Sequence, residues 1–146
     1  MSDFRRITDS FLASAQIAPA DLAEARRHGI ALVINNRPDA EEPGQPCGAD
    51  IAAAAARHGI DYRAIPVTHA GIGADQITAM AEALAGAGGP VLAYCRSGTR
   101  STLLWALAQA SAGADPDALA QAAQAGGYDL APVRAGLEQL AARARE

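Results

Sequence analysis

The chain has 146 residues, is 50% hydrophobic and carries 12 basic against 16 acidic side chains, for a formal net charge of −4. This length and composition predict one globular domain, residues 1–146, with a full-sized core. Because no basic block is present, binding to nucleic acid through a large electrostatic footprint is excluded. The sequence has no apolar run of ~20 residues and no signal-peptide core at its start, so we expect a cytoplasmic protein without a membrane partner.

Short apolar runs alternate with helical segments along the chain. Strands are predicted over 11–15, 30–34, 62–67 and 91–94, and helices over 19–28, 50–57, 75–85, 101–112, 116–125 and 132–145. Residues 35–48 are rich in Pro, Gly and Glu and form a long surface loop, and Asp50 and Asp75 are each expected to cap a helix. The alternation predicts a three-layer α/β fold, in which helices flank a central, mostly parallel sheet.

The segment VLAYCRSGTRS, residues 91–101, places a thiol at the end of a buried strand and just before a helix. Ligands of open α/β sheets bind beyond the carboxyl ends of the strands, and the unpaired N–H groups of a helix N-terminus attract anions. The same field favours the thiolate of Cys95, and Arg100 adds a positive charge nearby. We therefore predict a nucleophilic cysteine that faces an anion-binding loop made of Arg96, Ser97, Gly98 and Thr99, with the glycine turning the amides inward.

The two cysteines, Cys47 and Cys95, are expected to stay reduced, as in most cytoplasmic proteins. Neither their spacing nor that of the three histidines matches a metal site, so no metal and no other cofactor is expected. Cys47 lies in the predicted long loop. It is either an incidental thiol or a second thiol that accepts or resolves a modification of Cys95.

Four segments together resemble a known family. They read ALVINNRPDAEEPGQP, AIPVTHAGIGADQI, VLAYCRSGTRSTLLWALA and AAQAGGYDLAPV, and they are similar to the phosphatase-like domain of the bacterial beta-lactamase hydrolase-like proteins. The resemblance covers nearly the whole chain and implies a fold similar to that of dual-specificity and protein tyrosine phosphatases. It also implies sulfide-oxidising enzymes as partners, because members of the family occur fused to persulfide dioxygenases and sulfide:quinone oxidoreductases.

The cysteine loop departs from the phosphatase pattern His-Cys-x-x-Gly-x-x-Arg-Ser/Thr. Tyr94 replaces the histidine, and one residue fewer separates Gly98 from Arg100, so that the loop reads Cys-x4-Arg and resembles that of rhodaneses. A smaller ring of amides suits one transferred sulfur atom better than a tetrahedral phosphate. The leading hypothesis is therefore a sulfurtransferase, in which Cys95 takes sulfane sulfur from thiosulfate or a persulfide and passes it to a thiol acceptor.

Two alternatives to sulfur transfer stay open. One is a phosphomonoester hydrolase that forms a phosphocysteine at Cys95, with Ser101 helping to expel the cysteine in the second step. The other is a non-catalytic redox or anion sensor. A phosphatase needs a general acid, and residues 67–71 contain no aspartate. His69 and, in the preceding long loop, Asp39 remain as candidates.

The long loop has one further expected contact. Arg37 and Asp39 either pair and pin the loop near the active site, as the family motif implies, or belong to an ordinary turn whose backbone Pro38 fixes. Glu41 and Glu42 are expected to be solvated. Trp105 lies four residues after Ser101 on the predicted helix, so we expect it in the core.

Overall fold

A computed structural model describes residues 3–146. At its centre lies a five-stranded sheet with the spatial order β1-β2-β5-β3-β4. The strands are β1 (Arg5–Thr8), β2 (Phe11–Ser14), β3 (Leu32–Asn35), β4 (Asp61–Ala64) and β5 (Val91–Tyr94). The α-helices are α1 (Leu22–Arg27), α2 (Gly48–Arg57), α3 (Ala74–Gly86), α4 (Thr99–Ser111), α5 (Pro116–Ala125) and α6 (Arg134–Ala144), and the 3-10 helices η1 (Pro19–Asp21) and η2 (Ala131–Val133) precede α1 and α6.

The sheet is parallel except at one edge. Strand β5 pairs in parallel with both β2 and β3, and β3 pairs in parallel with β4. Strand β1, which the sequence did not predict, pairs antiparallel with β2 through a tight connection at Asp9 and Ser10. Its sequence, RRIT, buries only Ile7 fully, so it lacks the apolar run that marks the central strands.

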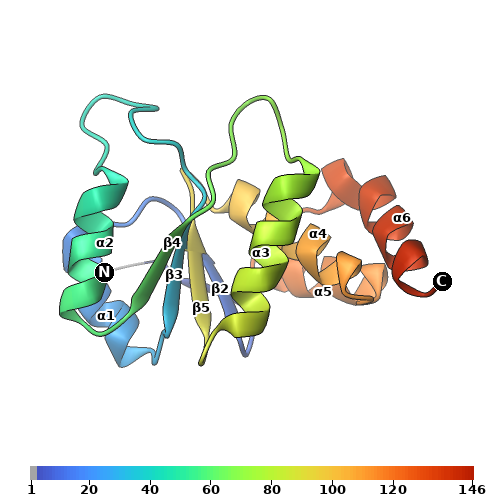
Figure 1. The fold of residues 1–146 in the computed structure, drawn as a ribbon, viewed down its shortest axis with the longest axis horizontal. Coiled ribbons are helices and arrows are strands. Elements are labelled where there is room, and N and C mark those ends of the chain that lie inside the picture. The colour runs from blue at the N-terminus through green and yellow to red at the C-terminus, as the bar shows by residue number, and fades with distance from the viewer. Residues whose placement is uncertain (1–2) are drawn as a thin grey trace.

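Helices cover both faces of the sheet, and alternate residues of each central strand supply the two cores. On one face, Leu12, Val33 and Leu92 pack with residues of α1 and α2. On the other face, Phe11, Ile34 and Val91 pack with residues of α3 to α6 (Figure 1). The predicted three-layer α/β fold with a mostly parallel sheet is confirmed.

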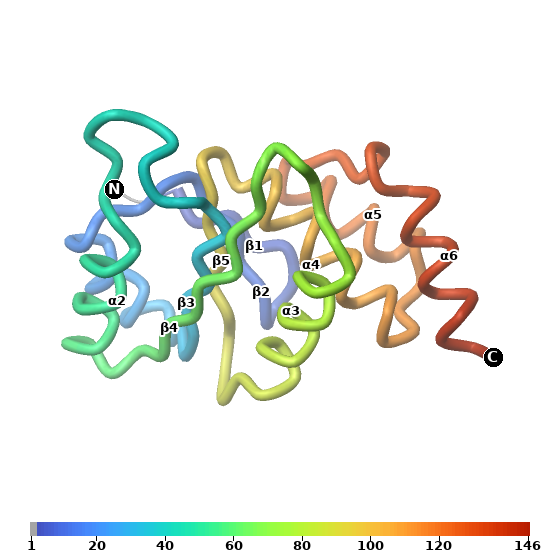
Figure 2. Tube along the Cα trace, turned by 45° about the horizontal axis from the view of Figure 1, so that its top comes forward, coloured from blue at the N-terminus to red at the C-terminus, as the bar shows by residue number. Residues whose placement is uncertain are grey.

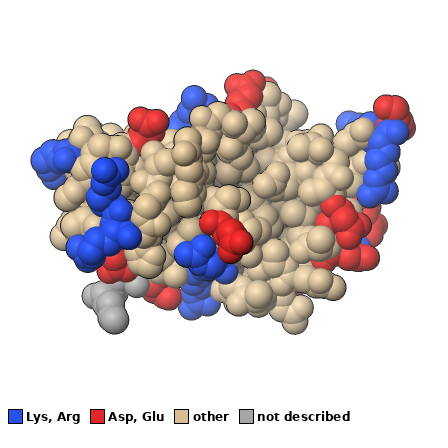
Figure 3. All heavy atoms as spheres, turned by 90° about the horizontal axis from the view of Figure 1, so that it is seen from below, with Lys and Arg blue, Asp and Glu red and all other residues tan. Residues whose placement is uncertain are grey.

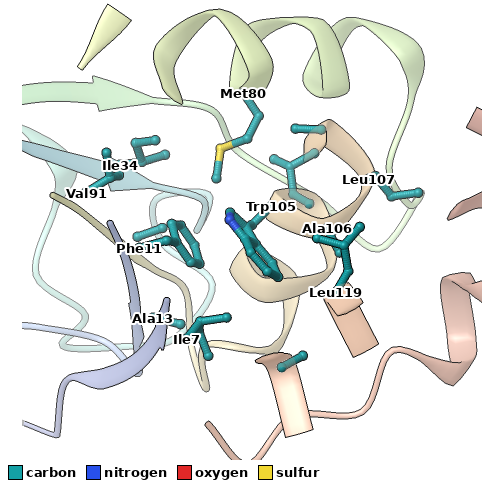
Figure 4. Packing of buried hydrophobic residues seen from close by; sticks show 14 of the residues in the cluster. Ile7, Phe11, Ala13, Ile34, Met80, Val91, Trp105, Ala106, Leu107 and Leu119 are labelled. Carbon is teal, nitrogen blue, oxygen red and sulfur yellow. The ribbon is translucent and has the colours of Figure 1, made fainter. Parts of the chain in front are cut away.

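Trp105 of α4 is the largest fully buried side chain. Its ring stacks on that of Phe11, with centroids 5.2 Å apart and an interplanar angle of 11°. Figure 4 shows both rings among aliphatic side chains, with Met80 of α3 above them. The prediction that Trp105 belongs to the core is confirmed, and α4 is thereby fixed against the sheet.

The predicted strand over 62–67 is shorter in the structure. Strand β4 ends at Ala64, although Ile65 and Val67 still donate backbone hydrogen bonds to the carbonyls of Asn35 and Asn36. Pro66 between them has no N–H to donate, which ends the regular ladder. The chain then continues as the loop 65–73, named here the β4–α3 loop.

Two predicted helix caps are wrong. The residue that caps α2 is Cys47, and the one that caps α3 is Gly73, so Asp50 and Asp75 lie inside the first turns. The first amide of α2, that of Gly48, donates instead to Oδ1 of Asp39 at 2.8 Å. A cap supplied from nine residues upstream leaves no local signal, so sequence spacing could not reveal it.

The loops at the carboxyl ends of the strands gather at one edge of the sheet. Figures 1 and 2 show residues 36–47, the β4–α3 loop and the start of α4 at this edge. The opposite end of the molecule carries scattered acidic and basic side chains among uncharged ones (Figure 3). Within residues 3–146, no helix is long and apolar enough to cross a membrane.

Candidate active site

Cys95 directly follows β5 and is fully buried. The amide of Gly98 donates a hydrogen bond to its Sγ at 3.1 Å. Gly98 has a φ of +94° and caps α4, so the chain turns back over the sulfur in a conformation that favours glycine. Since the sulfur lies at the floor of this loop, a reacting atom has to enter the loop to meet it.

Backbone amides around Cys95 are left without internal partners. Within residues 3–146, no acceptor is recorded for the amides of Arg96, Ser97, Arg100 and Ser101. They lie in the loop and in the first turn of α4, where helix geometry leaves N–H groups unpaired. Unpaired N–H groups and the positive end of a helix dipole attract anions, so this geometry agrees with the anion-binding loop expected here, which stays a prediction.

Arg100 is held by an acidic residue that the sequence analysis placed in solvent. Its Nη1 and Nη2 donate to the two carboxylate oxygens of Glu41 at 2.7 and 2.9 Å, and Nη1 also donates to the carbonyl of Val67 at 2.7 Å. The hydrogen bonds to Glu41 raise the pKa of Arg100 and outweigh its burial, and the nearby Cys95 sulfur adds to the increase. Hydrogen bonding to Arg100 in turn lowers the pKa of Glu41 from 4.5 to about 2.

A second arginine, Arg37, also binds Glu41. Arg37 is buried, and its Nε donates to Glu41 at 2.8 Å while its Nη2 donates to Glu42 at 2.5 Å. Burial lowers the pKa of Arg37, but the hydrogen bonds to both carboxylates raise it overall. The expectation of a solvated side chain is wrong for Glu41, whereas Glu42 is exposed although it pairs with Arg37. The expected pair of Arg37 with Asp39 is also wrong, because Asp39 instead binds the amide of Gly48.

The loop reaches this arrangement with local strain. Ala40 has a φ of +63°, a left-handed conformation that a residue with a Cβ seldom adopts. The turn at Ala40 brings Glu41 onto both arginines. Glu42 lies at the rim, where it also meets Nε of Arg96 at 3.2 Å, and the Arg96 side chain is otherwise mostly exposed.

The other predicted site residues lie at different depths. Ser101 is fully buried in the first turn of α4, and its Oγ has no hydrogen-bond partner within residues 3–146. His69 is exposed on the β4–α3 loop, two residues after the carbonyl of Val67 that binds Arg100. Cys47 is exposed at the start of α2, and both cysteines are unpaired.

Tyr128 is a site residue that sequence reasoning missed. Its hydroxyl donates to the carbonyl of Ser97 at 3.2 Å, and it packs so closely on Gly98 that a Cβ there would lie 2.2 Å from the hydroxyl oxygen. The guanidinium of Arg5 lies over its ring, 5.7 Å from the centroid. Burial raises the pKa of Tyr128. The segment AAQAGGYDLAPV contained the only signal, since it belongs to the family motifs.

The chain has relatives among known proteins. The family model described as "Beta-lactamase hydrolase-like protein, phosphatase-like domain" matches residues 3–112. A beta-lactamase hydrolase-like protein of Agrobacterium fabrum is 39% identical over 105 residues, which is 72% of this chain and 24% of that protein. The chain spans about a quarter to a third of the length of the curated relatives it matches.

Solved structures of phosphatases share the fold. A candidate phosphatase from Neisseria meningitidis is 33% identical, with a TM-score of 0.83 over 96% of this chain and 99% of that one. Pseudomonas aeruginosa TpbA, solved with phosphotyrosine, superposes with a TM-score of 0.68 over 99% of this chain and 91% of that one, at 17% identity. The predicted family and the protein tyrosine phosphatase-like fold are confirmed.

These findings correct the leading functional hypothesis. The prediction of a rhodanese-type sulfurtransferase is wrong, because the matching family model is a phosphatase-like domain and the 33% identical Neisseria meningitidis protein is a candidate phosphatase. The Cys-x4-Arg spacing indicates a shorter loop, but loop length alone does not determine which group is transferred. The sulfur donor, the thiol acceptor and a persulfide-resolving role for Cys47 depend on the rejected activity. The sulfide-oxidising partners stay a prediction.

Proposed function

Because the chain belongs to the phosphatase-like domain family of the beta-lactamase hydrolase-like proteins, we propose that it is a cysteine-dependent phosphomonoester hydrolase. One observation supports this more than any other. The buried sulfur of Cys95 lies beneath a loop whose amides have no internal acceptors within residues 3–146, beside the guanidinium of Arg100. Such a loop fits the oxygens of a phosphoryl group, which carry negative charge in both ground and transition states.

In the first step, the phosphoryl group passes from the substrate to Cys95. The loop amides and Arg100 bind the phosphoryl oxygens, and Sγ attacks phosphorus. The S–P bond forms while the ester P–O bond breaks, and the leaving oxygen takes a proton from a general acid. Because Glu41 binds the Nη atoms of Arg100, the guanidinium stays oriented while its Nε remains outside the carboxylate pair.

His69 is our candidate for the general acid. It is exposed on the β4–α3 loop, and that loop is fixed to Arg100 through the carbonyl of Val67. Imidazole donates a proton readily near neutral pH. Asp39 is the weaker candidate, because its carboxylate already accepts a hydrogen bond from the amide of Gly48.

In the second step, water hydrolyses the phosphocysteine. A water oxygen attacks phosphorus and gives a proton back to the group that protonated the leaving oxygen. The S–P bond breaks, and inorganic phosphate leaves with the sulfur restored as thiolate. We assign the assisting role in this step to Ser101, because its buried hydroxyl lacks a partner within residues 3–146 and lies in the same helical turn as Arg100. A hydroxyl that donates to the departing sulfur stabilises its negative charge.

The test is hydrolysis of phenyl phosphate by the whole chain. We expect turnover that Cys95→Ser abolishes and orthovanadate inhibits, and a phosphorus resonance of a thiophosphate ester in the rapidly quenched enzyme. Cys47→Ser is the matched control, because Cys47 is the other unpaired cysteine, and it should turn over normally. Turnover by Cys95→Ser at the parent rate would contradict the proposal. A single burst without further turnover would favour a phosphate-responsive sensor instead.

A further inference from the structure

A groove of about 530 Å³ opens beside Arg100, between the β4–α3 loop, α4 and α6. Most of its walls are apolar. They include Leu103 and Leu107 of α4, Leu140 of α6, and Ile72 and Ile77 from the loop and α3. Its size falls within the ~300–1,000 Å³ typical of small-molecule sites.

The charge of the groove differs in sign from that of the molecule. Its two charged lining residues are Arg100, whose charge is balanced by Glu41 behind it, and Arg143, and none of the described residues that line it is Asp or Glu. The chain as a whole carries a formal net charge of −4. A positively charged apolar groove in an acidic protein is complementary to an anionic amphiphile.

The groove adjoins the proposed reaction site at Arg100. Arg100 lies in the first turn of α4, two residues after Gly98, whose amide binds the Cys95 sulfur, and the same arginine forms part of the groove wall. The β4–α3 loop forms another part of the wall, and its Val67 carbonyl binds Nη1 of Arg100 at 2.7 Å. A molecule whose phosphoryl group is bound in the cysteine loop can therefore extend past Arg100 into the groove.

We infer that this groove binds the non-reacting part of the substrate, and that the substrate is a small phosphate monoester on an apolar chain that carries a second negative charge. The inference rests on the phosphatase function proposed above. The phosphoryl group meets the loop and Arg100, the chain covers the leucine and isoleucine walls, and the second anion meets Arg143.

A series of 4-alkylphenyl phosphates tests the apolar part, because the chain grows while the leaving group stays nearly constant. From phenyl to 4-octylphenyl phosphate, we expect KM to fall by up to about fourfold per added methylene until the groove is full, with kcat nearly unchanged. A KM that does not depend on chain length overturns the inference, although hydrolysis of phenyl phosphate would still support the proposed function.

If no phosphate ester is hydrolysed, the proposed function fails and the groove is tested by binding alone. Calorimetric titration of Cys95→Ser with 4-octylphenyl phosphate, with phenyl phosphate as the reference, should show at least tenfold tighter binding of the longer molecule. Equal affinities of the two compounds would overturn the inference.

Matched variants test whether the dependence on chain length comes from this groove. Leu140→Gln should reduce the ratio of kcat/KM between 4-octylphenyl and phenyl phosphate at least fivefold. The control Leu84→Gln changes another half-buried leucine that packs on the same core but lines a different hollow, and it should leave the ratio unchanged. Equal ratios in the two variants would overturn the inference.

A terminal carboxylate on the chain tests the second charge. It should lower KM about two- to fivefold relative to the uncharged chain, a gain typical of an exposed ion pair, and Arg143→Gln should remove this gain. The control Arg145→Gln alters an exposed arginine two residues away that does not line the groove, and it should keep the gain. If both variants or neither variant loses the lower KM of the carboxylate-bearing chain, the assignment of the second anion to Arg143 is overturned.

Two other occupants would contradict the inference. If phosphotyrosine peptides are hydrolysed with a higher kcat/KM than 4-octylphenyl phosphate, and Leu140→Gln lowers it, the groove binds peptide instead. If the wild-type chain sediments as a dimer and Leu140→Gln as a monomer, the groove binds a second copy. A monomeric wild type with the expected dependence on chain length supports the small-molecule assignment.

Discussion

Glu41 orients Arg100 while its own charge is stabilised by two arginines. Its carboxylate binds Nη1 and Nη2 of Arg100 and Nε of Arg37. Glu41→Gln keeps the shape but removes the charge, so Arg100 should lose its fixed orientation. We expect kcat/KM for phenyl phosphate to fall about 10- to 100-fold, as small misplacements of catalytic groups do. Glu138→Gln on α6, which removes an exposed carboxylate, is the control and should have wild-type kinetics.

The lowered pKa of Glu41 also links stability to pH. Because this pKa is about 2 in the folded chain instead of 4.5, the unfolded chain binds the proton more readily. The stabilisation is complete above pH 4.5 and is lost as the pH falls toward 2. Glu41→Gln should therefore lower the free energy of unfolding by about 1–2 kcal/mol at pH 7, and the difference from wild type should shrink below pH 4.5. Urea denaturation at several pH values measures the difference in free energy of unfolding between the two chains. A difference that does not change with pH would contradict the lowered pKa of Glu41.

His69 can be tested by varying the leaving group. If it protonates the leaving oxygen, His69→Asn should lower kcat for an alkyl phosphate about 100-fold or more, because an alkoxide is a poor leaving group. For 4-nitrophenyl phosphate, whose leaving group needs no proton, the loss should stay within about threefold. Equal losses for both substrates would assign His69 a different role, and Asp39→Asn would then be the next variant to measure.

For single residues, the sequence predicted which residues take part in the candidate site better than it predicted their contacts. Cys95, Arg100 and the loop glycine follow one another in the chain, so their proximity could be expected from a strand–loop–helix segment. Glu41 is 59 positions from Arg100, and Tyr128 is 31 positions from Ser97. Only the folded chain brings these residues together. Without knowledge of the partner, a charged residue in a loop is predicted to be solvated.

The β5–α4 loop depends on one glycine with two constraints. Gly98 needs a positive φ and has no room for a Cβ beside Tyr128, whereas Gly29 has a similar φ of +76° with nothing within 4 Å. Gly29→Ala should lower the free energy of unfolding by about 1–2 kcal/mol through backbone strain alone and leave turnover unchanged. Gly98→Ala should cost about 2–4 kcal/mol and lower kcat/KM more than 100-fold. Thermal unfolding measures the loss of stability and phenyl phosphate hydrolysis the loss of kcat/KM. Equal effects of the two variants would contradict the close packing of Tyr128 on Gly98.

Elements with strong apolar patterns were predicted well. The central strands are buried on both faces and read as continuous apolar runs, and α4 and α5 lie within two residues of their predicted ends. The missed strand β1 is polar and lies at the edge of the sheet, where pairing with β2 rather than burial makes it a strand. The wrong cap of α2 and the missed pair of Arg100 with Glu41 share a cause, because in both the partner comes from an earlier loop. The cap of α3 is local, since the amide of Gly73 donates to Gln76 three residues later.

The whole molecule extends beyond the region of the family match, which ends at residue 112. The later segment buries Leu119, Leu137 and Ala141 in the core that contains Trp105, and it supplies Tyr128 to the cysteine loop. A chain that ends at residue 112 should therefore lose cooperative thermal unfolding, since one core would be opened. A chain that ends at residue 144 lacks only two exposed residues and should unfold like the parent. Cooperative unfolding of the shorter chain would contradict the prediction of one domain over 1–146.

Residues 38–47 contain no buried side chain, so their attachment to the body relies on carboxylate–guanidinium pairs rather than on a hydrophobic anchor. Guanidinium chloride supplies a competitor with the same chemistry as the arginine side chains. Low concentrations of this salt should displace Glu41 and inactivate the enzyme while its tryptophan fluorescence stays native, whereas urea should abolish activity and fold in the same transition.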